Sequence, residues 1–484
     1  MNQSLSPAST PADVAPFLAT FDTLPLSPAM LSNLQQLAYL QMTPIQAASL
    51  PLALAGNDLI AQAKTGSGKT AAFGLPLLTK LNPKLFSVQA LVLCPTRELA
   101  DQVTQEIRRL ARFEENIKVL SLCGGSALRN QVTSLENGVH IVVGTPGRIM
   151  DHMERGSLKL DALTTLVLDE ADRMLDMGFH DDIAYIAKRC PKERQTLLFS
   201  ATYPEGIAQL ARQFLRQPQE VKLLEQHGES KIRQRFYEVK HEERLAAVVK
   251  LLKHYRPVSA LAFCNTKQQC RDLVNELRHA GIQALTLNGD LEQRERDQVL
   301  IQFANRSCSV LVATDVAARG LDISDLEAVI NVDVTPDPEI HIHRIGRTGR
   351  GDQEGWALSL CSHGDRRRVS AIAEAMACQL TWADLGTLDS SDNGKDSAPL
   401  VPPMSTLLML GGRKDKIRPG DVLGALTGDA GTADKFTAAQ IGKITVTDQN
   451  TYIAVNRDIA RAAIKKLEAG KVKGKTVKVR ILTN

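Results

Sequence analysis

Several common signals are absent from this chain of 484 residues. It has no apolar run of about 18 residues, so we expect no membrane-spanning helix. Residues 1–16 contain no Lys or Arg, whereas a secretory leader begins with a basic segment. The eight cysteines include no Cys-x-x-Cys pair, which disfavours a zinc site or a disulfide framework. These absences predict a cytoplasmic protein with reduced cysteines and no membrane partner.

Aromatic residues are scarce, at 4% of the chain, while the apolar fraction of 43% is ordinary for a globular protein. The net charge of +4 is unevenly distributed. Residues 411–484 contain 15 Lys and Arg against 7 Asp and Glu, a net of +8, and the other 410 residues contain 43 against 47, a net of −4. This asymmetry predicts a basic tail that binds a polyanion on which the body acts.

Short apolar runs alternate with amphipathic helical stretches in the first half of the chain. Four runs are predicted to be buried parallel strands, at residues 90–94, 140–144, 165–168 and 195–199. The second half repeats the pattern at residues 259–264, 284–287, 309–313 and 328–331. We therefore expect two α/β domains with doubly wound parallel sheets, which display their ligands at the carboxyl ends of the strands.

Breaks in the pattern divide the chain. We expect a disordered N-terminus at 1–20, α/β domains at 21–222 and 232–384, linkers at 223–231 and 385–403, and a third domain at 404–484. Within the third domain we predict strand 406–410, helix 419–427, strands 441–447 and 451–456, helix 457–469 and strand 475–482. This order is typical of a ferredoxin-like α+β sheet with two helices on one face. In the last strand, Val477, Val479 and Ile481 share one face, and Lys478 and Arg480 share the other.

A glycine-rich loop at residues 63–70 follows an apolar run. The predicted phosphate contacts are all eight of its residues: Ala63, Lys64, Thr65, Gly66, Ser67, Gly68, Lys69 and Thr70. Lys69 is expected to contact the β/γ oxygens and Thr70 to reach Mg²⁺. The strict pattern has Gly at position 63, where this chain has Ala. The alternative, a glycine turn before a helix, is disfavoured by the preceding strand and by an acidic pair downstream.

The acidic pair, Asp169 and Glu170, directly follows the predicted strand 165–168. We expect Asp169 to hold Mg²⁺ through water, and Glu170 to orient and deprotonate an attacking water. An isolated Asp-Glu pair is usually a solvated strand end. Here the apolar strand before it and the phosphate loop favour a catalytic pair.

Two arginines, Arg347 and Arg350, lie three residues apart and can face one direction. Arginine supplied from a second domain neutralises charge that develops on a γ-phosphate, so we predict that both are catalytic. The alternative is a surface ion-pair cluster. The nearby pair His341 and His343 could suggest a metal site, but no further ligands lie nearby in the sequence, and we expect His343 to form structural hydrogen bonds.

Together with Asp169-Glu170-Ala171-Asp172, Ser200-Ala201-Thr202 and the segment 343–350, these motifs resemble the DEAD-box RNA helicases over roughly residues 20–360. The resemblance implies two RecA-like domains that close on ATP and single-stranded RNA and separate short duplexes locally. It implies adenine contacts from Phe21 and Gln46, since a Gln amide pairs with both a donor and an acceptor. Gly320 and Asp322 match the positions that meet the ATP ribose.

The resemblance also implies contacts with the RNA backbone rather than with bases. The candidates are Arg97, Gly125, Thr145 and Arg148 in the first domain, and Thr266, Arg296 and Thr314 in the second. The residues expected to couple hydrolysis to domain opening are Asp172, Ser200, Thr202 and His343. One departure is Asn288, where many members of the family have His.

The tail resembles the RNA-binding domain of the bacterial DbpA family, through residues 418–426 and 471–475. The resemblance implies an RRM-like fold that binds structured 23S rRNA, with pre-50S particles as partners and a role in 50S assembly. Only Tyr452 is well placed for base stacking, so we expect a basic surface to bind the RNA. Its predicted members are Lys443, Lys465, Lys466, Lys473, Lys475 and Lys478.

The residues leave two functions of different class open. The first is an RNA-dependent ATPase that remodels rRNA, and the second is an ATP-gated RNA clamp in which strand separation is incidental. A DNA translocase is disfavoured, because the Gln46 segment and the Asp-Glu-Ala-Asp tetrad are typical of RNA enzymes. We expect ATP and Mg²⁺ as cofactors, no DNA partner and a monomer.

Overall fold

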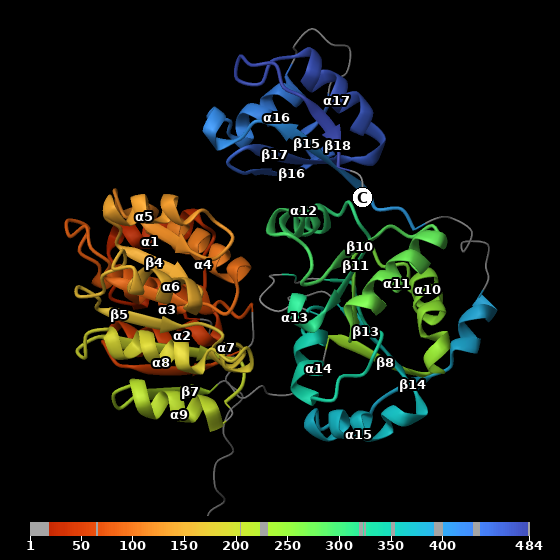
Figure 1. The fold of residues 1–484 in the computed structure, drawn as a ribbon, viewed down its shortest axis with the longest axis horizontal. Helices are drawn as coiled ribbons and strands as arrows, with labels where there is room; N and C mark the ends of the chain where they lie inside the picture. Colours follow the sequence, from red (N-terminus) through yellow and green to blue (C-terminus); the bar gives the residue numbers. More distant parts are fainter. Residues whose placement is uncertain are drawn as a thin grey trace, which may run out of the picture. The chain divides into compact units, whose positions relative to one another are not determined.

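The structure is a computed structural model that describes residues 19–63, 66–203, 205–222, 231–318, 323, 326–349, 354–391, 400–428 and 436–482. Its contacts divide the chain into two compact units between residues 226 and 227. Figure 1 shows the elements of both units. The predicted N-terminal segment 1–20 and the linkers 223–231 and 385–403 lie wholly or partly outside the described residues.

The first unit contains a parallel sheet of seven strands in the order β3-β4-β2-β5-β6-β1-β7. The strands are β1 (Leu59–Gln62), β2 (Ala90–Leu93), β3 (Val119–Leu122), β4 (Ile141–Gly144), β5 (Thr165–Leu168), β6 (Gln195–Ser200) and β7 (Gln219–Lys222). The helices are α1 (Pro28–Gln36), α2 (Pro44–Leu54), α3 (Lys69–Lys80), α4 (Arg97–Leu110), α5 (Leu128–Glu136), α6 (Pro146–Glu154), α7 (Ala171–Asp176), α8 (His180–Arg189) and α9 (Glu205–Phe214).

Alternating residues of one strand enter two separate hydrophobic cores in this unit. Ala90 and Val92 of β2 pack in one core, and Leu91 and Leu93 pack in the other. Because neighbouring side chains on a strand point to opposite faces, both faces of the sheet are covered. The first sheet is therefore doubly wound, as the continuous apolar runs predict.

The second unit contains a second parallel sheet of seven strands in the order β10-β11-β9-β12-β13-β8-β14. The strands are β8 (Ile232–Glu238), β9 (Ala260–Cys264), β10 (Ala284–Leu287), β11 (Val310–Thr314), β12 (Ala328–Asn331), β13 (Gly355–Cys361) and β14 (Trp382–Ala383). The helices are α10 (Arg244–Tyr255), α11 (Lys267–His279), α12 (Gln293–Ala304), α13 (Asp315–Ala318), α14 (Pro338–Ile345) and α15 (Arg366–Ala375).

The tail forms an antiparallel sheet of four strands in the order β16-β17-β15-β18. Its elements are β15 (Met404–Leu410), α16 (Pro419–Thr427), β16 (Ile441–Val446), β17 (Asn450–Asn456), α17 (Ala460–Ala469) and β18 (Val479–Ile481). Side chains of α16 and α17 share one core with the sheet, which confirms the α+β prediction. The last strand is shorter than the predicted 475–482, but Val477 and Val479 are buried and Lys478 and Arg480 are exposed, as predicted.

Short 3₁₀ helices complete the described structure. They are η1 (Phe21–Thr23), η2 (Ala111–Phe113), η3 (His241–Glu243), η4 (His363–Asp365), η5 (Leu385–Ser391), η6 (Arg413–Asp415), η7 (Ala438–Gln440) and η8 (Arg457–Ile459). Across the described ranges, no helix is long and apolar enough to cross a membrane. All eight cysteines are free and seven of them are buried.

Within the second unit, the tail sheet also packs on its other face. Tyr452 of β17 is only 3% exposed and accepts a hydrogen bond from Gln298 of α12 at 3.5 Å. Thr406 of β15 hydrogen-bonds to Asn305 at 3.1 Å and to Ser307 at 2.5 Å. The face opposite the two helices is therefore covered here, and the Tyr452 ring is not exposed for base stacking.

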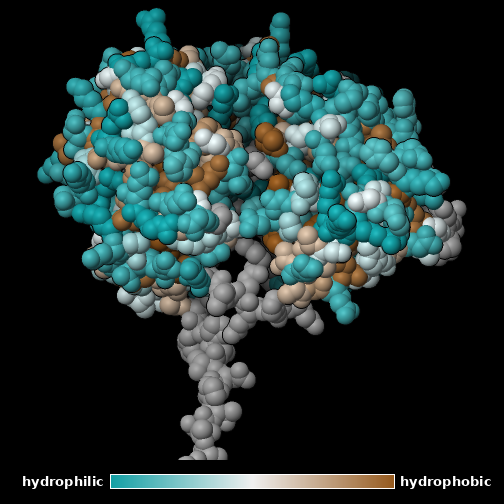
Figure 2. Space-filling model, turned by 60° about the horizontal axis from the view of Figure 1, so that its bottom comes forward, coloured by the Kyte–Doolittle hydropathy of each residue, from teal (hydrophilic) through white to brown (hydrophobic). Residues whose placement is uncertain are grey.

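The face of the molecule in Figure 2 is mainly hydrophilic, with hydrophobic side chains in small groups. The large apolar residues exposed in the described part of the chain are Leu40, Leu85, Phe86, Val316, Trp382, Val401, Leu410 and Leu423. Except for Leu85 and Phe86, no two of them are neighbours in the sequence.

Candidate functional site

The glycine-rich loop connects β1 to α3 and has the backbone of an anion site. Gly66 and Gly68 have φ angles of 82° and 93°, in the left-handed region that glycine adopts without strain. A Cβ on Gly68 would lie 2.5 Å from Nε2 of Gln46, so no larger residue fits there without a shift. Helix α3 begins at Lys69, so the first N–H groups of the helix point toward the loop. Lys64 and Thr65 lie outside the described residues.

Lys69 is buried within the loop, with 6% of its surface exposed. Its Nζ donates a hydrogen bond to the carbonyl of Ala63 at 3.0 Å. Thr70 follows on the same helical turn and is half-buried. A buried ammonium next to helix N–H groups provides concentrated positive charge, which suits the phosphates of a nucleotide.

The side chain of Gln46 links α2 to this loop. Its Oε1 accepts from the N–H of Thr43 at 2.9 Å, and its Nε2 donates to the carbonyl of Gly68 at 3.0 Å. Each of the two amide atoms thus has one partner within the protein and keeps one further donor or acceptor position for adenine. Phe21 packs in the first core, with its ring 6.1 Å from that of Tyr39. The adenine contacts stay predictions.

The acidic motif follows β5 and is buried. Oδ1 of Asp169 is buried without a hydrogen-bond partner, and burial raises the pKa of this carboxyl to about 6, while Lys69 opposes the shift. A buried carboxylate oxygen without a donor fits a hard cation such as Mg²⁺. Among the described residues, no cluster of three His, Cys, Asp or Glu side chains forms a metal site of protein ligands alone. One carboxylate plus phosphate oxygens is a common Mg²⁺ arrangement.

Glu170 has an unusual backbone conformation and a buried ion pair. Its φ of 51° is left-handed, which is uncommon for a residue other than glycine and occurs often at functional sites. Its Oε2 lies 2.6 Å from Nη1 of Arg173, which is in the first turn of α7, the helix that follows Glu170. Arg173 thus fixes the direction of the Glu170 carboxylate.

The third acidic residue, Asp172, holds the segment that follows β6. Its Oδ2 accepts from the N–H groups of Ala201 and Thr202 at 3.0 and 2.9 Å, and from Oγ1 of Thr202 at 3.1 Å. Oγ of Ser200 accepts from the N–H of Asp172 at 3.3 Å. The structure therefore brings together three of the predicted coupling residues, which lie about 30 positions apart in the sequence. Their role in coupling stays a prediction.

The predicted RNA contacts of the first unit follow β2, β3 and β4. Arg97 begins α4, and a Cβ on Gly124 would lie 2.7 Å from its Nη2, so the guanidinium packs directly on the glycine backbone. Gly125 has a φ of 82°. Thr145 precedes α6, and Arg148 lies in its first turn. Parallel strands end at one edge of a sheet, which places all four predicted residues there.

The predicted contacts of the second unit have the same placement. Thr266 caps α11, with its Oγ1 accepting from the N–H of Gln269 at 3.1 Å. Thr314 ends β11, and Oγ1 accepts from the N–H of Ala317 at 3.4 Å. Nη2 of Arg296 donates to the carbonyl of Ala317 at 2.6 Å. Asn288, the departure from the family pattern, is buried and accepts from the N–H of Asp290 at 3.0 Å.

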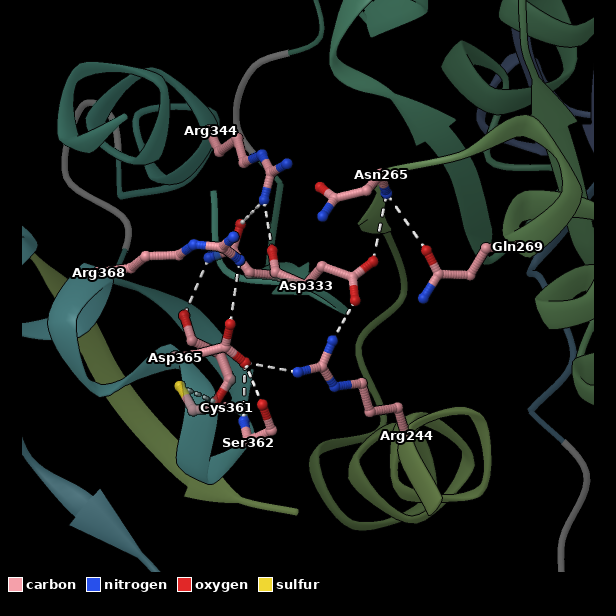
Figure 3. A network of polar contacts seen from close by, with 11 residues as sticks. Arg244, Asn265, Gln269, Asp333, Arg344, Cys361, Ser362, Asp365 and Arg368 are labelled. Atoms are coloured by element: carbon pink, nitrogen blue, oxygen red, sulfur yellow. Dashed lines mark hydrogen bonds and ion pairs between the residues drawn. The ribbon is translucent and has the colours of Figure 1, made fainter. Parts of the chain in front are cut away.

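A buried ionic cluster fixes these segments of the second unit, and Figure 3 shows it around Asp333. The carboxylate of Asp333 pairs with Arg244 and accepts from the N–H of Asn265 at 3.2 Å. Its carbonyl accepts from Nη1 of Arg344 at 2.7 Å. Arg344 also forms two bonds to the carboxylate of Asp315, at 2.6 and 2.7 Å. Sequence reasoning missed this cluster, because its members are far apart in the chain.

The cluster joins the helix before the predicted catalytic arginines to two RNA-contact segments. Arg347 is buried three residues after Arg344, while Arg350, Gly320 and Asp322 lie outside the described residues. His341 is buried, and neither ring nitrogen has a hydrogen-bond partner. His343, the predicted coupling residue, lies on α14 and is half-buried.

Five of the six lysines predicted for the tail surface are exposed: Lys443, Lys465, Lys473, Lys475 and Lys478. Lys466 is not, because it is only 4% exposed and its Nζ lies 5.3 Å from the centre of the Phe436 ring. Its assignment to the surface was wrong, since it lies on the core side of α17. The sequence pattern of the two adjacent lysines does not show which one faces inward.

The structure adds basic residues that the sequence analysis did not single out. Exposed Arg413, Lys414, Lys416 and Arg418 precede α16. Nζ of Lys473 donates to the carbonyl of Lys416 at 2.6 Å, and Lys475 pairs with Asp415 at 3.1 Å, so the two loops lie side by side. We call residues 413–418 and 471–475 the basic loop pair. Four basic residues within six positions were the available signal.

Comparison with known proteins agrees with this geometry. Residues 43–210 match the DEAD/DEAH box helicase model, residues 243–352 the helicase conserved C-terminal domain, and residues 406–481 the DbpA RNA binding domain. The chain is 50% identical to the ATP-dependent RNA helicase DbpA of Escherichia coli over 96% of this chain and 100% of that protein. It is 45% identical to the ATP-dependent RNA helicase CshA of Listeria monocytogenes over 78% of this chain and 73% of that protein.

A solved structure of Saccharomyces cerevisiae Dbp5, bound to RNA and ADP BeF3, resembles the fold with a TM-score of 0.70 and 31% identity. The match covers 78% of this chain and 98% of that chain. The domain models and the relatives thus indicate one family, and this chain has the phosphate loop, the acidic motif and two RecA-like sheets. The chain belongs to the DbpA family of DEAD-box ATP-dependent RNA helicases.

Proposed function

We propose that this helicase separates short RNA duplexes locally and that its tail directs it to structured 23S rRNA during assembly of the 50S subunit. The match to a DbpA RNA binding domain and the tail charge of +8 support an RNA target for the tail. The rRNA target and pre-50S particles come from the family resemblance. We also propose that the protein acts as a cytoplasmic monomer and does not use DNA.

The observation that carries the ATP part of the proposal is the Oδ1 atom of Asp169, which is buried and has no hydrogen-bond partner. Burial raises the pKa of the Asp169 carboxyl, and the positive charge of Lys69 opposes this rise. Asp169 and Thr70 would hold Mg²⁺, which supplies positive charge to the phosphate oxygens when bound. Lys69 and the loop N–H groups bind the phosphates of ATP. Glu170, oriented by Arg173 at 2.6 Å, orients and deprotonates the attacking water.

The residues of the second unit complete the proposed chemistry. Arg347 and Arg350 would neutralise charge that develops on the γ-phosphate. The RNA contacts come from Thr and Arg side chains and from backbone groups, including those of Gly125, at strand ends, which suit phosphates and 2′-hydroxyls. Binding in the helicase body would therefore be independent of RNA sequence, and the tail would supply the preference.

We predict that ATP hydrolysis depends on RNA and on Glu170. ATPase activity should rise with RNA, and the equivalent DNA should not stimulate it. Glu170→Gln should lower kcat by roughly 10²- to 10⁴-fold, since it removes the proposed base. Retained ATP binding and an unchanged melting temperature would show that the variant is folded, and Glu136→Gln, at the exposed end of α5, is the matched control.

Two outcomes would change this conclusion. Equal ATP hydrolysis with and without RNA would contradict an RNA-dependent enzyme. If Glu170→Gln instead retained full activity in ribosome assembly in cells, the ATP-gated clamp would be the better description, because turnover would then be dispensable.

A further inference from the structure

Gln131 on α5 is a buried polar residue that no role described so far requires. It is 5% exposed, yet its amide forms three hydrogen bonds. Nε2 donates to the carbonyl of Cys123 at 3.0 Å. Oε1 accepts from Nη1 of Arg148 at 3.0 Å and meets Nε2 of His152 at 3.0 Å. Every partner belongs to a different segment from α5.

The chemistry of the partners fixes the orientation of this amide. The Cys123 carbonyl can only accept, and the Arg148 guanidinium can only donate, so a flipped amide would lose both bonds. His152 must then donate through Nε2, which leaves Nδ1 to accept from Oγ of Ser157 at 2.8 Å. Burial, aided by the charge of Arg148, lowers the pKa of His152 and favours this neutral form.

Cys123 and Arg148, two partners of Gln131, lie in two of the three segments proposed to contact RNA in the first unit, after β3 and after β4. Cys123 begins the loop in which Gly124 packs against Arg97 and Gly125 has a positive φ. Arg148 is itself one of the proposed contacts. Recognition of an RNA backbone requires several protein groups spaced to match successive phosphates. A shift of about an ångström between the loop after β3 and the first turn of α6 would therefore move the proposed RNA-contact residues out of that spacing.

We propose that Gln131 is a positioning residue for RNA, which holds the loop after β3 and the first turn of α6 in the register that fits one RNA backbone. This inference rests on the proposed RNA contacts of the first unit. Gln131 does not touch RNA in this proposal and acts through Cys123 and Arg148.

The chain offers a matched control in Gln89. It is 3% exposed and also forms three hydrogen bonds, to the N–H and carbonyl of Asn82 and to the carbonyl of Leu85, at 2.8, 2.9 and 2.8 Å. It directly precedes β2, at the amino end of the sheet, whereas the RNA segments follow the carboxyl ends. A purely structural role would make the two glutamines equivalent.

The experiment compares Gln131→Met with Gln89→Met in the full chain, since Met preserves the length of the side chain. The half-saturating RNA concentration, kcat, KM for ATP and the melting temperature are measured with a generic single-stranded RNA. Both variants should melt at a lower temperature. Only Gln131→Met should raise the half-saturating RNA concentration, by about tenfold, with KM for ATP unchanged.

A third variant, Gln131→Glu, carries the test if Gln131→Met does not fold. It keeps acceptors for Arg148 and His152 and loses the donor to Cys123. The half-saturating RNA concentration, called the RNA constant below, should therefore rise less than in Gln131→Met. An unchanged RNA constant in the folded Gln131 variants, or an equal rise in Gln89→Met, would overturn the inference.

Arg148→Ala separates failure of this inference from failure of the proposed function. If Arg148→Ala raises the RNA constant and the Gln131 variants do not, only the positioning role is wrong. If Arg148→Ala and the Gln131 variants all leave the constant unchanged, this surface does not bind RNA, and both conclusions fail.

Discussion

At the scale of single residues, burial decides which ionisable groups are charged and what they can do. Asp169 and Lys69 are both buried, and the charge of Lys69 counteracts the rise in the pKa of the Asp169 carboxyl. His341 shows the opposite case of a buried group with no compensating partner. Burial, aided by the charge of Arg344, lowers its pKa to about 4 from 6.5.

We predict that His341 makes the stability of the protein fall in acid. An unfolded His binds a proton near pH 6.5, whereas the folded one does so only near 4, so the unfolded state takes up more protons between these values. Stability should be fully present above about pH 6.5 and decrease as the pH falls to 4, by about 3 kcal/mol at most.

The measurement is thermal unfolding of the wild type and His341→Phe at several pH values. Phe lacks a titrating group and can still stack on Phe236, whose ring lies 5.9 Å from that of His341. The melting temperature of the variant should rise relative to the wild type as the pH falls. A difference that does not depend on pH would show that His341 does not control the acid response.

At the scale of elements, the ends of strands are held together by buried polar contacts between segments. In the first unit, Asp172 after β5 binds the segment after β6, and Gln131 joins the loop after β3 to α6. In the second unit, Asp333 after β12 joins α10, α14 and the loop after β9. These contacts position the proposed RNA and ATP residues more firmly than the loops alone would.

We predict that Arg244→Met strongly destabilises the second unit. The arginine pairs with both Asp333 and Asp365, and all three side chains are buried. Removing it leaves the buried carboxylate of Asp333 without its ion-pair partner and takes one of two arginines from Asp365, which costs roughly 3–5 kcal/mol. Thermal or urea unfolding measures the effect, and Arg212→Met is the matched control, because its ion pair with Glu205 is exposed and contributes at most about 1 kcal/mol. Equal losses in the two variants would contradict this account.

At the scale of the whole molecule, charge and coverage distinguish the tail from the helicase body. The sheet face that contains Tyr452 and Thr406 is covered within the second unit. The basic loop pair, by contrast, contains seven exposed basic residues: Arg413, Lys414, Lys416, Arg418, Lys471, Lys473 and Lys475. Deletion of the tail would therefore remove charge and also expose a face that is now buried. Substitutions in the basic loop pair change the charge alone, so they test the RNA role of the tail better than its deletion does.

We predict that Lys414→Ser combined with Lys471→Ser weakens binding to structured rRNA and leaves the ATPase at saturating generic RNA unchanged. Both lysines are exposed. Each lost phosphate contact should reduce the slope of log affinity against log salt by about 0.7–0.9. Binding titrations at several salt concentrations measure this slope. The same change at exposed Lys84 and Lys159 is the control, and an unchanged slope in the loop variant would rule out phosphate contacts there.

The prediction from sequence was most accurate for buried strands, whose apolar residues are adjacent in the chain. The strand ends at Leu93, Leu168 and Ser200 agree with the predicted runs to within one residue, because a buried parallel strand is a continuous apolar segment. Strand β7 was not predicted, since its residues Gln219, Glu220 and Lys222 are exposed and polar. The final strand was predicted too long, because alternation continues beyond its hydrogen-bonded residues.

The residue sequence on its own determined the chemistry of this protein: a phosphate loop, an acidic motif and a basic tail, each encoded by adjacent residues whose local backbone is nearly independent of the rest of the chain. Only the tertiary structure decided which polar groups meet across distant segments and which basic residues face water. Gln131 and Asp333 act through partners from other elements, and Lys466 is buried beside exposed Lys465. Burial and long-range hydrogen bonds depend on how the elements pack, and packing is a property of the whole fold.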